Sequence, residues 1–197
     1  MNKFFIPLIA LFFIIIFIVI ILSSNSTKII SSQNEIEVIK DESNLDIIVN
    51  LGNFSKDNYS ESMLLDIAMQ YATKLNLSNE LKTDDNYIQY VNKDDLHNII
   101  LELTGIVVEA PIIIDDFYYL YDSENSYYYY LGVSPQYYNI SKINQIERTK
   151  NNYKINCSIH KNIDGEFFNI EDVVIILNFK PNQNIIKYQL EQIIINN

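Results

Sequence analysis

The chain has 197 residues and is 48% hydrophobic, enough for one domain with a real core and too short for two ordinary domains. Lysine and arginine number 14 against 25 aspartates and glutamates, a formal net charge of −11, which excludes nucleic acid as an expected partner because phosphate binding needs basic side chains. Cys157 is the only cysteine, which excludes an internal disulfide and a multi-cysteine metal site.

The chain begins with an unbroken apolar run that starts at Phe4 and ends at Leu22. At 1.5 Å per residue, roughly 19 residues nearly cross a 30 Å hydrocarbon core, so the run predicts an uncleaved single-pass transmembrane helix over residues 1–22. Lys3 on the short side then leaves the N-terminus in the cytoplasm and the acidic remainder outside, in the cell envelope. The alternative is a signal sequence cleaved near Ser24 or Ser26, which would give a secreted protein.

Residues 23–56 mix serine, asparagine, lysine and glutamate with short apolar stretches. This composition predicts a stalk or linker, in which residues 45–49 could form an edge strand. The domain itself is then expected over residues 57–197.

Two helices are predicted in the first part of this domain. Apolar residues recur every three or four positions after Ser60, a possible N-cap, and predict an amphipathic helix over residues 60–76. A second helix starts after Asn92, whose side chain can cap it, and ends at Gly105, where a C-terminal glycine belongs. Residues 87–91 between the helices could form a short strand.

After Gly105 the apolar period changes from 3.6 to 2, the period of a strand. Residues 153–160 alternate with Cys157 on the dry side, and further strands are expected over residues 143–149, 173–179 and 185–195. The dipeptide Asp164-Gly165 is a hairpin signal. The predicted class is therefore α+β, with two helices packed on one face of an antiparallel meander sheet of about five or six strands.

At the level of architecture, this order of elements resembles the curved-sheet folds called cystatin-like and NTF2-like. The resemblance implies helices on one side of a curved antiparallel sheet. No motif supports either name, and a fold alone does not give a function. No family is therefore assigned.

Catalytic and metal-binding motifs are absent from the sequence, so no catalytic residue, metal ligand or cofactor is predicted. His160 lies three positions after Cys157 on one strand, which sends their side chains to opposite faces and argues against a nucleophile and base pair. The other histidine, His97, is expected at the rim of the second helix. Acidic doublets occur at Asp84-Asp85, Asp94-Asp95 and Asp115-Asp116.

The stretch YYLYDSENSYYYYLG, residues 118–132, predicts a β-hairpin rich in tyrosine. With the loop placed at residues 122–126, Tyr119 and Tyr129 belong to the face against the helices. The other face is open and gives the candidate ligand-binding residues, which are Asp116, Tyr118, Tyr128 and Tyr130. Such rings could stack on a sugar or anchor a protein partner.

These features predict a membrane-anchored binding or interaction module of the cell envelope, without catalysis and with an envelope protein or a glycan as partner. One alternative is a cell-envelope hydrolase that uses carboxylates such as Asp115 and Asp116, since glycosidases need two converging carboxylates. The other is a structural subunit that assembles with itself.

Overall fold

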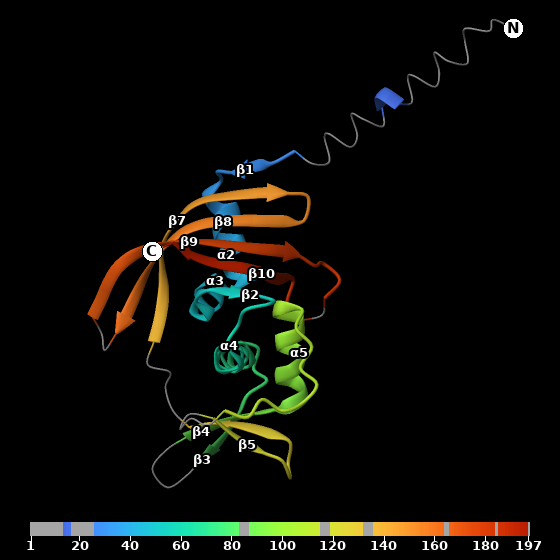
Figure 1. The fold of residues 1–197 in the computed structure, drawn as a ribbon, viewed down its shortest axis with the longest axis vertical. Helices are drawn as coiled ribbons and strands as arrows, with labels where there is room; N and C mark the ends of the chain where they lie inside the picture. The colour runs from blue at the N-terminus through green and yellow to red at the C-terminus, as the bar shows by residue number, and fades with distance from the viewer. Residues whose placement is uncertain are drawn as a thin grey trace, which may run out of the picture.

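The computed structural model places two antiparallel sheets on either side of a helical layer (Figure 1). It describes residues 14–16, 26–82, 87–114, 119–131, 136–163, 166–183 and 185–196. The α+β class with antiparallel sheets is confirmed. The second sheet was not predicted, and it proves to be the one that carries the tyrosine hairpin.

Both helices predicted for the domain are present. They are α4 (Glu61–Lys74) and α5 (Lys93–Thr104). Asn92 caps α5, because its side-chain oxygen accepts a hydrogen bond of 2.8 Å from the Asp94 N–H. Gly105 follows with φ +74°, the left-handed conformation that suits glycine after a helix.

The larger sheet has six strands among the described residues and contains the predicted meander. In spatial order its strands are β1 (Lys28–Ile30), β7 (Gln136–Thr149), β8 (Asn152–Ile163), β9 (Glu166–Phe179), β10 (Tyr188–Asn196) and β2 (Phe54–Ser55). Burial alternates along β8 as predicted, and Cys157 is fully buried. The predicted turn at Asp164-Gly165 lies outside the described residues, between the end of β8 and the start of β9.

The smaller sheet has four described strands, in the order β3 (Asn79–Lys82), β4 (Tyr87–Asn92), β6 (Tyr127–Tyr130) and β5 (Tyr119–Asp122). The tyrosine hairpin of β5 and β6 therefore pairs with β4 and is not the first hairpin of the meander. This corrects the single-sheet prediction. Strand pairing joins segments far apart in the sequence, so a local pattern cannot assign a hairpin to one sheet or another.

The predicted stalk is also corrected, from Lys28 onward. Residues 28–55 form β1, α2 (Gln33–Ser43), α3 (Leu45–Ile48), the 3₁₀ helix η1 (Val49–Leu51) and β2. Leu45 and Ile48 are completely buried, so this segment belongs to the core. Its polar composition was misleading, because α2 and α3 use a few well-spaced apolar residues to pack on the rest of the domain.

The prediction of a single-pass transmembrane helix is corrected as well. Within the described residues, no helix is long and apolar enough to cross a membrane, which takes about 20 residues. The structure describes residues 14–16 of the predicted segment, as a short helical piece. The rest of residues 4–22 lies outside the described residues.

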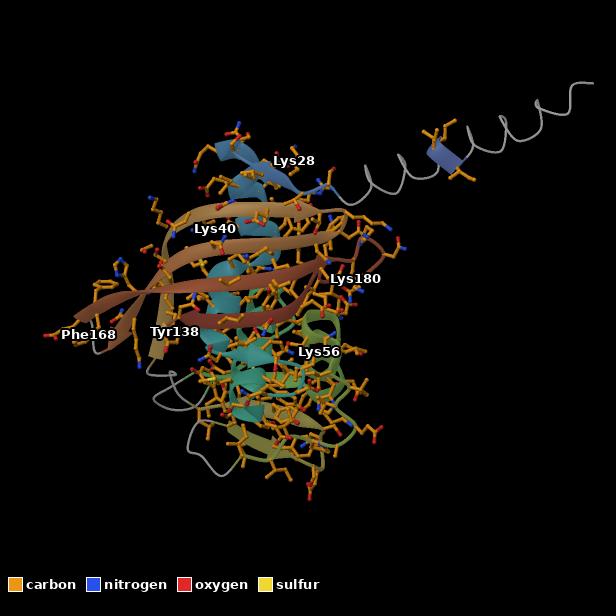
Figure 2. The ribbon with its side chains drawn as sticks, turned by 45° about the horizontal axis from the view of Figure 1, so that its top comes forward. Lys28, Lys40, Lys56, Tyr138, Phe168 and Lys180 are labelled. Carbon is orange, nitrogen blue, oxygen red and sulfur yellow. The ribbon has the colours of Figure 1, made fainter. Side chains whose placement is uncertain are left out.

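The helical layer contacts both sheets. α5 packs on α4, on β10 of the larger sheet and on β4 of the smaller one. Beyond the end of β10, the strands β7, β8 and β9 continue as a curved arm (Figures 1 and 2). Its first strand stays close to η1, because the Tyr138 N–H donates a hydrogen bond of 2.6 Å to Asn50 Oδ1. Phe168 is exposed on this arm (Figure 2). The site described next lies between α4 and the smaller sheet.

Candidate functional site

The register of the tyrosine hairpin differs by one residue from the predicted register. Tyr119 lies opposite Tyr130, and Tyr121 lies opposite Tyr128. The loop spans residues 123–126, because Asp122 belongs to β5 and its carboxylate accepts hydrogen bonds from loop amides. The shift turns Tyr128 and Tyr130 to the face against the helices, and the sequence pattern could not decide this because both faces carry tyrosine.

Tyr128 is a structural residue, which corrects its predicted place on an open face. Its side chain is fully buried, and burial raises the pKa of its hydroxyl to about 12. The hydroxyl accepts a hydrogen bond of 2.7 Å from the Ile112 N–H and lies 3.4 Å from His97 Nε2. Tyr128 therefore ties the segment after α5 to the sheet.

The outer face of the smaller sheet carries the rings of Tyr90, Tyr127 and Tyr129. Tyr90 contacts Tyr127 edge to face, with centroids 5.2 Å apart, and also lies beside Tyr129. Tyr129 was expected in the core, and the shifted register instead places it half-buried on this outer face. Tyr119, also expected in the core, is buried at 9% exposure.

Two of the four predicted ligand-binding residues, Asp116 and Tyr118, lie outside the described residues. The same holds for Asp115 and for the doublet Asp84-Asp85. The remaining doublet, Asp94-Asp95, occupies the first turn of α5, where the helix dipole favours carboxylates.

The fourth predicted residue, Tyr130, lines a pocket between α4 and the inner face of the smaller sheet. The pocket has a volume of about 340 Å³. Its lining residues come from α3, α4, β4, β5 and β6, and they are Ile47, Asp66, Met69, Gln70, Thr73, Lys74, Gln89, Tyr119 and Tyr130. Small-molecule sites have volumes of about 300 to 1,000 Å³, so the pocket is large enough for a compact ligand.

Regular backbone geometry places the polar groups of this pocket. Asp66, Gln70 and Thr73 follow one another at intervals of four and three along α4, so they share one side of the helix. Across the sheet, Tyr130 of β6 lies opposite Tyr119 on one side and Gln89 on the other. These three residues form a row that faces α4.

Hydrogen bonds hold the two walls of the pocket together. The Tyr119 hydroxyl donates to Asp66 Oδ1 at 2.5 Å, and Gln70 Nε2 donates to Asp66 Oδ2 at 3.1 Å. Thr73 Oγ1 lies 3.2 Å from Gln89 Oε1 and 3.0 Å from the Met69 carbonyl oxygen, and its one proton can be donated to either acceptor. The rings of Tyr119 and Tyr130 stack with centroids 5.2 Å apart and planes 29° apart. The wall positions are thus fixed before any ligand arrives.

The chemistry of this lining suits binding. It combines one carboxylate, two amides, an aliphatic hydroxyl, an ammonium group and the rings and hydroxyls of two tyrosines with the apolar side chains of Ile47 and Met69. Among the described residues, those of the pocket included, no group of three or more histidine, cysteine, aspartate and glutamate side chains could hold a metal ion.

Cys157 and His160 do not form a catalytic pair, as expected from their spacing. The Cys157 thiol is fully buried, and burial raises its pKa to about 12. The His160 side chain leaves the other face of β8, where its ring meets Phe167 with centroids 6.1 Å apart.

Sequence reasoning missed Asp66, Gln70 and Gln89. Asp66 and Gln70 did carry a signal, a polar pair at spacing i, i+4 beside the apolar face of α4. Gln89 carried none, because the residue it lies beside in the pocket, Tyr130, comes 130 − 89 = 41 positions later in the chain.

Comparisons with protein-family models, with curated protein sequences and with solved structures find no match for this chain.

Proposed function

We propose that this protein is a binding module whose site is the pocket between α4 and the smaller sheet. The observation that carries the proposal is the convergence of polar side chains from α4 with Gln89 and Tyr130 of the sheet in one ligand-sized hollow. Ligand sites usually combine an apolar lining with a few placed polar groups. The hydrogen bond between Tyr119 and Asp66 adds rigidity, which lowers the entropy cost of binding.

The two other functions remain predictions. A hydrolase of the predicted kind needs two carboxylates that converge across a bond. Among the described lining residues of the pocket, Asp66 is the one carboxylate, while Asp115 and Asp116 lie outside the described residues. No contact among the described residues tests whether the protein assembles with itself.

Placement outside the cytoplasm stays a prediction, and so does an envelope protein or a glycan as partner. No described residue tests either of them. The finer likeness to cystatin-like or NTF2-like architecture also stays a prediction. It adds no functional argument, because unrelated functions share such folds.

The test compares two neighbouring tyrosines of one strand. Tyr130 lines the pocket, whereas Tyr129 lies on the opposite face of β6, so Tyr130→Leu and Tyr129→Leu make a matched pair. A library of soluble polar fragments would be screened by ligand-observed NMR against the wild type and both variants. We expect hits that are lost with Tyr130→Leu and kept with Tyr129→Leu. Hits that persist in both folded variants would show that binding occurs elsewhere.

A further inference from the structure

We infer that the ligand of this pocket is an uncharged saccharide ring. The inference rests on the proposed function and names the ligand class of the same site. Three properties of the described lining support it: its balance of charge, its mixture of donors and acceptors, and its aromatic platform.

The charge of the lining favours a neutral ligand. Asp66 and Lys74 are its charged residues among those described, so the formal charge of the lining is −1 + 1 = 0. An anionic ligand would lie near the Asp66 carboxylate in a chain of net charge −11, and a cationic ligand would meet the Lys74 ammonium. Each charged ligand is repelled by one of these groups and attracted by the other, so the lining gives it no net electrostatic gain for the cost of leaving water.

The polar groups of the lining match hydroxyls. The amides of Gln70 and Gln89 each carry two N–H donors and an oxygen with two lone pairs. Asp66 uses one Gln70 donor and Thr73 uses one Gln89 lone pair, so each amide keeps both donor and acceptor capacity for a ligand. The Thr73 hydroxyl oxygen can also accept. Neighbouring hydroxyls on a sugar ring have the same dual character, so they can satisfy such a lining. A purely apolar ligand would remove these polar groups from water without offering partners, which costs free energy.

The aromatic platform suits the flat, carbon-rich face of a sugar ring. Tyr130 is half-buried at the pocket and stacks on Tyr119 with planes 29° apart. Tyr119 is in turn held by its hydrogen bond to Asp66. The pair therefore presents a rigid aromatic surface beside the polar groups of the pocket. A saccharide ring has the matching features, an apolar face and polar edges.

The outer face of the same sheet also carries tyrosine rings. There Tyr90 meets Tyr127 with planes 73° apart and lies beside Tyr129 with planes 32° apart. Tyr127 lies opposite Asn92 and Asp122, which are the outer-face polar residues in register with it. The saccharide is assigned to the inner face because the rings there line a pocket that they share with Asp66, Gln70 and Gln89.

The experiment uses sugars that differ mainly in charge. Glucose would be compared with glucuronate, which carries a carboxylate, and with glucosamine, which carries an ammonium group in place of one hydroxyl at a pH where its amine is protonated. Each sugar would be titrated into the protein with isothermal calorimetry and backbone amide NMR. We expect the neutral member of each pair to bind more tightly. We also expect Tyr130→Leu and Gln89→Leu to weaken binding at least about tenfold, or about 1.4 kcal/mol, while Tyr129→Leu leaves affinity unchanged.

The outcomes separate this inference from the proposed function. If polar fragments bind in a Tyr130-dependent way but no neutral sugar does, or if a charged sugar binds more tightly than its neutral counterpart, the saccharide inference is wrong and the pocket remains a binding site. If sugars bind equally to the wild type and to folded Tyr130→Leu, both the inference and the pocket assignment are wrong.

Discussion

The Tyr119 hydroxyl donates a hydrogen bond of 2.5 Å to Asp66 Oδ1, although the two residues are 53 positions apart in the sequence. One residue belongs to β5 and the other to α4, so this bond joins the two walls of the pocket. It also holds the ring on which Tyr130 stacks. The bond therefore links the stability of the domain to the geometry of the site.

Tyr119→Phe removes this donor and keeps the ring. We expect the free energy of unfolding to fall by about 1 to 3 kcal/mol, the usual effect of losing a hydrogen bond to a charged group. Ligand affinity should fall as well, because the stacked pair loses its anchor. Urea unfolding and calorimetry would measure the two effects. Tyr129→Phe is the control on the outer face, and equal stabilities of the two variants would contradict the expectation.

Tyr128→Phe separates a structural role from a ligand contact. The change leaves the buried Ile112 N–H without the acceptor that now lies 2.7 Å away. We expect a loss of about 1 to 3 kcal/mol in the free energy of unfolding, with ligand affinity unchanged in the folded protein. A variant that is as stable as the wild type but binds ligand more weakly would show that Tyr128 contacts the ligand.

His97 should make the domain less stable in mild acid. Burial lowers the pKa of its imidazole, as does nearby Lys93 to a smaller extent, whereas Asp94 and the Val108 carbonyl act in the opposite direction. The unfolded chain therefore binds the proton more readily than the folded one. The contribution of the neutral His97 side chain to stability is fully present above the ordinary pKa of about 6.5. It is lost as the pH falls through the lower pKa of the folded state.

The matched variant is His97→Gln, which cannot titrate in this range. Urea unfolding at pH 7.5 and pH 5.5 should show a larger loss for the wild type than for His97→Gln. Carboxylates contribute to acid sensitivity in both proteins, so the difference between the two losses reports the histidine. Identical losses would mean that the His97 pKa does not change on folding.

Cys157 should be inert in the folded protein. Its thiol is fully buried and its pKa is raised to about 12 by burial, so the reactive thiolate is scarce and inaccessible. We expect no reaction with a disulfide reagent at pH 8 until denaturant is added. Ser158→Cys supplies the control, because position 158 lies on the other face of β8 and should react at once. Prompt labelling of the wild type would show that β8 opens readily.

Several elements could be predicted because their signals are local. The apolar spacing of α4, the Asn92 cap and Gly105 terminus of α5, and the alternation along β8 each lie within about a dozen neighbouring residues. The burial of Cys157 followed from that alternation. By contrast, α2 was overlooked because its polar residues outnumber the few apolar side chains that pack against the core.

The sequence by itself determined the class of the fold, the two central helices and the meander, since hydrophobic period and capping act between near neighbours. Only the tertiary structure decided which sheet the tyrosine hairpin joins, and that its one-residue shift in register buries Tyr128 and brings Tyr130 to a pocket with Asp66. The physical reason is that strand register is fixed by partners distant in the chain. Where tyrosine occupies both faces of a strand, hydrophobic pattern gives no preference between them.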